Sequence, residues 1–236
     1  MSIFKFKYFS VYQSKSVHPI GTDSMILGAL VSNKQDATTI LDIGTGSGVL
    51  ALMCAQRFPT AKIVGIDIDS QSTITADSNF ERSPWSSRLT ARQSSLSQFK
   101  SEYSFDVIVS NPPFYEETYH SPYIDRVRQR NSVSLPLKEL FTQSAELLST
   151  TGSIWLILPY RRKEESEQLF EQAGLSVRKE ITLFGKPFIP SRIIFELGFE
   201  TGFHQRLSSS ITVRNLDGTY SGQYKELTKD FHDRPL

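Results

Sequence analysis

Short apolar segments alternate with helical patterns along this chain, and the alternation constrains the fold more than any other feature of the sequence. The segments TTILDI, AKIVGIDID, FDVIV and GSIWLILP have the composition of buried strands, whereas SGVLALMCAQRF, ITADSNFERS and LKELFTQSAELL carry apolar residues at helical spacing. Strands that alternate with helices of this length are typical of a mainly parallel sheet. The pattern therefore predicts an α/β fold whose ligands bind at the carboxyl ends of the strands.

Two further β-rich runs near the C-terminus, VRKEITLF and SRIIFELGF, are separated by GKPFIP. They predict an antiparallel pair at the edge of the sheet, with Pro187 and Pro190 in the connection, because proline cannot donate to a sheet ladder. The 236 residues, of which 39% are hydrophobic and 22% charged, have the balance of one globular domain. We expect a single domain over residues 1–236, in which residues 1–38 form an extension before the first core strand.

Composition excludes several classes of protein. No apolar run approaches the length of a membrane span, and MSIFKFKYFS lacks the apolar core of a signal peptide, so we expect a cytoplasmic protein without membrane association. We also expect a monomer. A single cysteine, Cys54, excludes an internal disulfide and a cysteine-rich metal site, and its apolar helical surroundings predict a buried side chain. The histidines lack ligand spacing, so we expect no metal. The net charge of +1 indicates that any polyanion site is a local patch.

A glycine-rich turn, LDIGTGSGVLAL, follows the first core strand and opens a helix. Gly44, Gly46 and Gly48 allow a tight turn and a close approach of the backbone to a ligand. Such turns also bind dinucleotides or occur without any ligand, but the GxGxG spacing and Asp42 at the strand end argue against a nicotinamide cofactor. Asp67 ends the next strand about twenty residues later, where its carboxylate can accept hydrogen bonds from ribose hydroxyls. Together these features favour S-adenosylmethionine.

The loop SNPPFYEE follows the strand FDVIV and is stiff, because proline fixes its own φ and restricts the residue before it. The side-chain oxygen of Asn111 and the carbonyl of Pro112 can accept two hydrogen bonds, and Phe114 offers a flat face for stacking. Two acceptors that bind both hydrogens of an amine on an sp2 carbon would direct its lone pair at a methyl donor without a strong base. A proline turn capped by core aromatics is the structural alternative. The position of the loop, after the fourth strand of a chain that carries LDIGTGSG, favours the amine site.

These motifs give the chain a resemblance to the class I S-adenosylmethionine-dependent methyltransferases that modify amino groups through an NPP[YFW] motif. It is similar, nearly end to end, to the bacterial tRNA(Val) adenine N6-methyltransferase family, through IGTDSMILGAL, LDIGTGSGVLALMCAQR, SNPPFY and YSGQYKELTKDF. The resemblance implies a Rossmann-like fold, S-adenosylmethionine as cofactor, and a tRNA substrate in which an anticodon-loop adenine is methylated.

The resemblance also implies roles for individual residues. The residues that would hold the cofactor are Asp42, Gly44, Gly46 and Gly48 along its length, Asp67 at the ribose, Thr22 and Asp23 at the methionine end, and Ser95, Leu96 and Asn111. The target amine would lie among Asn111, Pro112, Pro113 and Phe114. Relatives commonly carry an acidic residue where this chain has Ser95. Because a hydroxyl is the weaker acceptor for the adenine amine, this departure predicts a lower affinity for the cofactor.

Two basic segments are candidates for contacts with RNA phosphates. Lys5 and Lys7 alternate with phenylalanines in FKFKYF, which predicts a strand with both lysines on its solvent side. Arg126, Arg128 and Arg130 closely follow the NPPFY loop, and arginine is well suited to phosphate. For both segments an ordinary solvated surface is the alternative.

Two other functions stay open at this point. One is N5-methylation of a protein glutamine, because NPPF also fits a side-chain amide, although enzymes of that kind usually carry a helical domain before the first strand. The other is a non-catalytic RNA-binding module of the same fold. Such a module has no physical need for a pair of acceptors around an amine, so adenine methylation is the favoured hypothesis.

Overall fold

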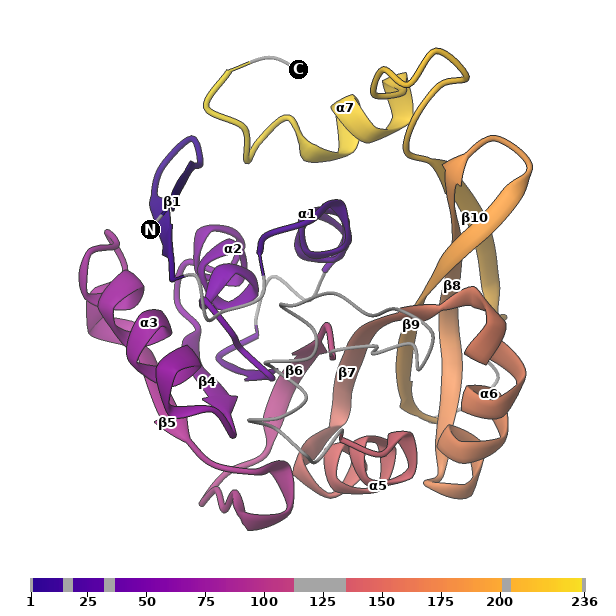
Figure 1. Ribbon diagram of the computed structural model, residues 1–236. Helices are drawn as coiled ribbons and strands as arrows, with labels where there is room; N and C mark the ends of the chain where they lie inside the picture. Colours follow the sequence, from indigo (N-terminus) through magenta and orange to yellow (C-terminus); the bar gives the residue numbers. More distant parts are fainter. Residues whose placement is uncertain (1, 15–18, 32–36, 113–134, 201–204, 235–236) are drawn as a thin grey trace.

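The centre of the molecule is an eight-stranded sheet, seen in a computed structural model that describes residues 2–14, 19–31, 37–112, 135–200 and 205–234 (Figure 1). Its strands are β3 (Thr39–Ile43), β4 (Lys62–Asp67), β5 (Leu89–Gln93), β6 (Phe105–Ser110), β7 (Leu148–Pro159), β8 (Leu175–Lys186), β9 (Ile189–Phe199) and β10 (Leu207–Thr212). The order across the sheet is β10-β8-β9-β7-β6-β3-β4-β5. All pairs from β7 to β5 are parallel, β10 is parallel to β8, and β9 is antiparallel to both of its neighbours.

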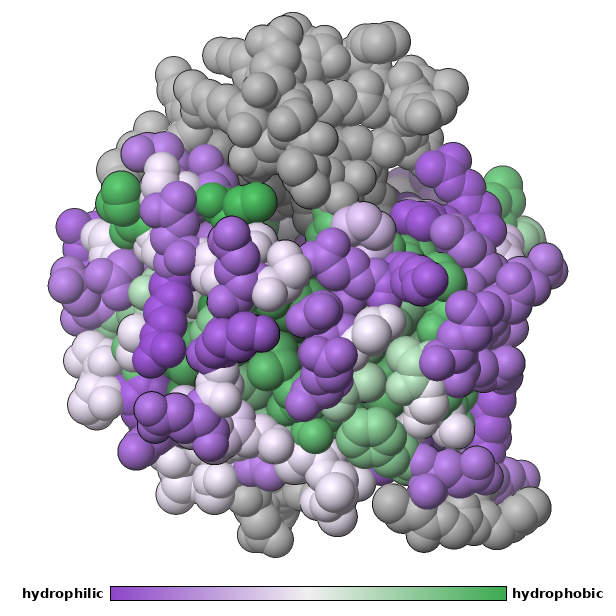
Figure 2. All heavy atoms as spheres, turned by 90° about the horizontal axis from the view of Figure 1, so that it is seen from below, coloured by the Kyte–Doolittle hydropathy of each residue, from purple (hydrophilic) through white to green (hydrophobic). Residues whose placement is uncertain are grey.

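Helices cover both faces of this sheet (Figure 1). One face is packed against α1 (Thr22–Leu30), α2 (Val49–Arg57), α3 (Ser70–Glu81), α7 (Gly222–Thr228) and the hairpin of β1 (Ser2–Lys5) and β2 (Ser10–Gln13). The other face is packed against α5 (Leu137–Leu147) and α6 (Lys163–Gln172). Short 3-10 helices occupy η1 (Ser86–Arg88), η2 (Leu96–Gln98) and η3 (Tyr160–Arg162). Seen from below, the surface is mostly hydrophilic, with hydrophobic residues visible between the polar ones (Figure 2).

Strand β3 shows how the sheet positions the chemical groups. Successive side chains of a strand point to opposite faces. Ile40 therefore joins the core under α1 and α2, and Leu41 joins the core under α5. Asp42 points to the same face as Ile40 and is fully buried there. Because β3 is parallel to both β4 and β6, the carboxyl ends of the three strands meet at one edge, which we call the carboxyl edge.

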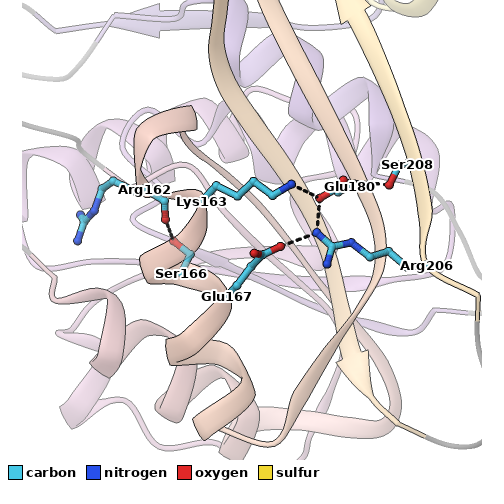
Figure 3. Close-up of polar contacts among 7 residues, drawn as sticks. All are labelled: Arg162, Lys163, Ser166, Glu167, Glu180, Arg206 and Ser208. Atoms are coloured by element: carbon cyan, nitrogen blue, oxygen red, sulfur yellow. Dashed lines mark hydrogen bonds and ion pairs between the residues drawn. The ribbon is translucent and has the colours of Figure 1, made fainter.

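An ionic network around Glu180 attaches α6 and β10 to β8 (Figure 3). Lys163 Nζ lies 3.0 Å from Glu180 Oε2, and Ser208 Oγ donates to Glu180 Oε1 at 2.9 Å. Arg206 donates both to Glu180 and to Glu167 of α6. Burial acts to raise the pKa of Glu180, but the hydrogen bonds from Arg206, Lys163 and Ser208 outweigh it and lower the pKa to about 2. The ionised carboxylate of Glu180 therefore joins α6, β8 and β10.

The mainly parallel sheet with its antiparallel C-terminal pair is confirmed, and two details of the prediction were wrong. The pair is not the outermost part of the sheet, because β10 follows on the far side of β8. Pro190 lies inside β9, where it faces Phe184, rather than in the connection. The ladder shifts register on both sides of Phe184, and a proline without an N–H is tolerated beside such an irregularity.

Three smaller predictions can be compared with the structure. FKFKYF is not a strand throughout: β1 ends at Lys5, Phe6 forms an isolated bridge with His232, and Lys7 lies in a bend. Both lysines are exposed, as expected. Cys54 is fully buried, as its apolar helical surroundings predicted. Within the described parts of the chain, no helix is long and apolar enough to span a membrane.

Candidate functional site

The loop between β3 and α2 has a backbone that glycine adopts most readily. Gly44, Gly46 and Gly48 have φ angles of 72°, 56° and 81°, in the left-handed region that costs other residues about 1–2 kcal/mol. The glycines at the two ends of the loop differ in their surroundings. A Cβ on Gly48 would lie 2.5 Å from Cε1 of the buried Phe80, whereas a Cβ on Gly44 would have nothing within 4 Å. Gly48 is thus required by the packing of α2 against α3, and Gly44 leaves the backbone open at the carboxyl edge.

Asp67, the last residue of β4, holds this loop from the neighbouring strand. Its Oδ2 accepts a hydrogen bond from the N–H of Gly46 at 2.9 Å, and its Oδ1 accepts one from the N–H of Asp69 at 2.9 Å. Burial is the main cause that raises the pKa of Asp67, and these two bonds oppose it. Each carboxylate oxygen can accept more than one donor, so both keep capacity for a further hydrogen bond such as one from a hydroxyl.

Asp42 of β3 holds the glycine loop from within its own strand. It is fully buried beneath the loop, where its Oδ2 accepts from Thr45 Oγ1 at 2.7 Å and from the N–H of Ala51 at 3.2 Å. Its Oδ1 has no hydrogen-bond partner among the described residues, and burial raises the pKa of Asp42 to about 7. The structure therefore gives Asp42 a role in holding the loop and the start of α2, and direct contact with a cofactor stays a prediction.

Asn111 lies directly after β6, at the same edge. Its Nδ2 donates to Ser24 Oγ at 3.0 Å, across 87 positions of sequence, so the first turn of α1 orients this amide. With Nδ2 on the side of Ser24, the carbonyl end Oδ1 is directed away from Ser24 and can accept a hydrogen bond from another group. Ser110 Oγ donates to the carbonyl of Ile43 at 2.9 Å, which ties the end of β6 to the end of β3. The amide and the glycine loop are thereby held at one edge.

The residues beside Ser24 on α1 link the site to β9. Asp23 Oδ2 lies 2.8 Å from Nε of Arg192, and the side chains are 31% and 36% exposed. Arg192 was not singled out by any pattern in the sequence, because the pair joins residues 169 positions apart. Thr22 and Asp23 lie beside Ser24 in the first turn of α1. Their contact with a cofactor stays a prediction.

Ser95 and Leu96 follow the carboxyl end of β5, the strand next to β4. The N–H of Ser94 donates to the carbonyl of Asp67 at 3.0 Å, which places this turn next to the end of β4. Ser95 is partly exposed and its Oγ lies 3.3 Å from Ser97 Oγ, whereas Leu96 is buried in the core under α5. Only Ser95 of the two therefore presents a polar group near the edge.

The remaining predicted residues are divided between described and undescribed parts of the chain. Pro112 is described and buried, next to Asn111. Pro113, Phe114, Arg126, Arg128 and Arg130 lie outside the described residues. Lys5 and Lys7 belong to the N-terminal hairpin, which packs against α3 through the hydrogen bond from the N–H of Tyr12 to Asn79 at 2.9 Å. Lys7 also lines a surface pocket of about 400 Å³ together with residues that include Tyr8, Tyr12 and Arg82.

Known proteins match this chain over most of its length. Residues 11–179 match the family model of the methyltransferase small domain. A tRNA1(Val) (adenine(37)-N6)-methyltransferase from Flavobacteriaceae bacterium (strain 3519-10) is 36% identical over 235 residues, with 99% of each chain covered. A protein of the same name from Parabacteroides distasonis is 35% identical over 232 residues, with 97% of each chain covered.

Among solved structures, a predicted O-methyltransferase from Agrobacterium tumefaciens has a TM-score of 0.65 at 14% identity and covers 88% of this chain and 96% of its own. At that identity the likeness shows the fold alone, a class I methyltransferase fold. The sequence matches carry the closer assignment: the chain belongs to the methyltransferase small domain family and, within it, to the family of the tRNA1(Val) (adenine(37)-N6)-methyltransferases.

Proposed function

We propose that this protein transfers the methyl group of S-adenosylmethionine to the exocyclic N6 of adenine 37 in tRNA(Val). The observation that carries the proposal is the hydrogen bond between Asn111 and Ser24, which presents an amide oxygen at the edge where the glycine loop and Asp67 lie. Full-length similarity to relatives that bear this activity in their names supports the choice of substrate. A tRNA substrate also fits a cytoplasmic protein.

The described residues at the carboxyl edge fit S-adenosylmethionine. The open space at Gly44 allows a ligand to approach the backbone, and the carboxylate of Asp67 has acceptor capacity for ribose hydroxyls. Thr22 and Asp23 would lie at the methionine end, and Ser95 would accept from the adenine amine. Bound there, the cofactor would supply an electrophilic methyl group, and the chain would have to bring a nucleophile to it in the right orientation.

Asn111 provides that orientation in the proposal. Its Oδ1 accepts one hydrogen of the adenine N6 amine, and the carbonyl of Pro112 accepts the other. An amine held by two acceptors turns its lone pair out of the ring plane, where it can attack, so positioning and electrostatics replace a strong base. Ser24 is the positioning residue, because a flipped amide would present the donor Nδ2 to an amine that is itself a donor.

The proposal assigns the remaining predicted residues to the RNA. Phe114 would stack on the target adenine, which must leave the base stack to reach a methyl donor inside the protein. Lys5, Lys7, Arg126, Arg128 and Arg130 are proposed phosphate contacts, since phosphate binding supplies much of the affinity in such complexes.

A labelling experiment tests the function against its alternatives. Methyl-labelled S-adenosylmethionine is incubated with the protein and with tRNA, protein and DNA fractions in parallel. We expect label in tRNA as N6-methyladenosine. Label in protein as N5-methylglutamine would assign the amide substrate instead, and tight tRNA binding without any transfer would indicate a non-catalytic module.

An Asn111 variant tests the mechanism in the same assay. Asn111→Ala should lower the single-turnover rate by roughly 100-fold or more, which is the scale for removal of one preorganised polar group, while the affinity for S-adenosylmethionine changes much less. Turnover close to that of the unmodified protein would contradict the two-acceptor mechanism.

A further inference from the structure

The tip of the β8–β9 hairpin has a backbone conformation that its residues do not favour. Lys186 pairs with Ile189, so the connection between β8 and β9 consists of Pro187 and Phe188 alone. Phe188 has a φ of 77°, and among the described residues it alone, apart from glycines, has a positive φ. Proline at the first loop position and a positive φ at the second are the signature of a type II turn, in which glycine or asparagine normally occupies the second position. A bulky residue there is strained.

Nothing within the hairpin offsets this strain. The Phe188 side chain is 86% exposed and that of Ile189 is 73% exposed, so their burial stabilises neither the turn nor the core. Lys186, beside them, is also exposed. Glycine would adopt this turn without the strain. A strained residue that the fold does not require indicates a functional role for its side chain.

The hairpin projects from the edge that carries the candidate site. Ser110, the last residue of β6, pairs with Leu156 of β7, and Leu156 pairs with Phe195 of β9. Phe195 therefore lies level with Ser110. Phe188 comes seven residues before Phe195, just ahead of the start of β9 at Ile189. At about 3.3 Å per residue, it lies roughly 20 Å beyond the level of Ser110 in the direction of the carboxyl edge. The long β8–β9 pair forms the right-hand part of the sheet in Figure 1.

The base of the hairpin is fixed relative to Asn111 by α1. Arg192 of β9 contacts Asp23, and the next residue along α1, Ser24, accepts the hydrogen bond from Asn111. Two consecutive residues of one helical turn thus connect the hairpin and the amide acceptor. A substrate that contacts both the tip and Asn111 must be considerably larger than a nucleotide, and a folded RNA loop meets that requirement.

We propose that the β8–β9 tip is a second contact surface for the substrate tRNA, in which Phe188 stacks on an unpaired nucleobase several nucleotides away from the target adenine and Lys186 binds an adjacent phosphate. Proteins recognise unpaired RNA bases by stacking them on aromatic side chains, and the stacking tolerates any base because each has a π-face. The ring is exposed at the turn, where a base can reach it. This inference rests on the proposed tRNA substrate and adds a contact to it.

The test compares Phe188→Gly with Phe188→Trp in the full-length protein. Phe188→Gly relieves the strain, so thermal stability should be unchanged or higher, yet the KM for a tRNA(Val) transcript should rise about 5-fold to 150-fold, which is the range that one aromatic stacking contact supports. Phe188→Trp should keep the KM close to that of the unmodified protein, because a flat face remains. The affinity for S-adenosylmethionine, measured by calorimetry without RNA, should not change in either variant.

Tyr103→Ala is the matched control. Tyr103 is an aromatic residue with 46% exposure. It precedes β6 and so lies at the amino end of that strand, opposite the carboxyl edge. Its removal should therefore leave the KM for tRNA unchanged. Lys186→Ala should reduce the dependence of tRNA binding on salt concentration, because it removes one phosphate contact.

Three results would overturn the proposal. If Phe188→Gly binds and methylates tRNA like the unmodified protein, the tip is not a contact, although the proposed function stands. If the substitution instead changes the mass of the protein in solution and leaves tRNA binding intact, the tip serves association of the chain with itself. If the unmodified protein transfers no methyl group to tRNA in the same assay, the proposed function fails and the inference falls with it.

Discussion

Two glycines of the same loop should respond differently to the same substitution, Gly→Ala, one mainly in stability and the other mainly in ligand binding. At Gly48, alanine would have to adopt a φ of 81°, which costs about 1–2 kcal/mol. Its Cβ would also lie 2.5 Å from Cε1 of Phe80 and 3.3 Å from the Cβ of Ala76, and overpacking of a dense core costs about 1–3 kcal/mol. We therefore expect Gly48→Ala to lower the free energy of unfolding by about 2–5 kcal/mol.

At Gly44 only the backbone cost applies, about 1–2 kcal/mol, because nothing lies within 4 Å of the added Cβ. If a cofactor approaches the backbone there, the methyl group enters its space, and the affinity for S-adenosylmethionine should fall about tenfold or more. Gly44→Ala is thus mainly a binding variant and Gly48→Ala mainly a stability variant.

Urea unfolding and calorimetric titration with S-adenosylmethionine, carried out on both variants, separate the two roles. Gly48→Ala with an unfolding free energy equal to that of the unmodified protein would refute the packing argument. Gly44→Ala with unchanged cofactor affinity would show that no ligand approaches the backbone at the end of β3.

Three further substitutions test other contacts. Asp67→Ala should weaken the binding of S-adenosylmethionine by about 1–3 kcal/mol, because a polar partner is left unsatisfied, and unchanged affinity in a titration would remove Asp67 from the site. Ser24→Ala should lower kcat about 2-fold to 10-fold, which corresponds to one hydrogen bond to Asn111, whereas Ser24→Thr, which keeps a hydroxyl, should lose less; equal losses would argue against the positioning role. Glu180 has a pKa of about 2 in the folded protein, below its usual 4.5, so its network stabilises the fold above pH 4.5 and loses that contribution as the pH falls towards 2. After allowance for solvent screening we expect about 1–2 kcal/mol, and Glu180→Gln should show a smaller loss of unfolding free energy between pH 7 and pH 3 than the unmodified protein.

The central strands were predictable because local signals agree there. Buried parallel strands are continuous apolar runs, and here each is bounded by a turn-forming residue: Gly44 follows TILDI, Asp67 ends KIVGID and Asn111 follows FDVIVS. The glycine loop and Asp67 were found in the same way, since both are read from a few consecutive residues. Their hydrogen bond, from the N–H of Gly46 to Asp67, follows from the pairing of two adjacent parallel strands.

Contacts across long stretches of sequence could not be predicted in this way. No pattern relates Ser24 to Asn111 or Asp23 to Arg192, because each pair forms only when α1 packs against the finished sheet. Pro190 was placed in the connection because proline disfavours a ladder, and the register shift that accommodates it is visible only in the paired strands. The strained turn was hidden for a related reason, since KPFI lacks the glycine that marks a type II turn.

The most direct test of the proposed function is a map of the methyl group on its substrate. Unmodified tRNA(Val) is incubated with the protein and S-adenosylmethionine, cut into fragments and analysed by mass spectrometry, beside a transcript that carries guanosine at position 37. We predict N6-methyladenosine in the fragment that contains position 37, and no methylation of the guanosine transcript. Equal methylation of both transcripts, or methyl groups only at other positions, would contradict the assignment.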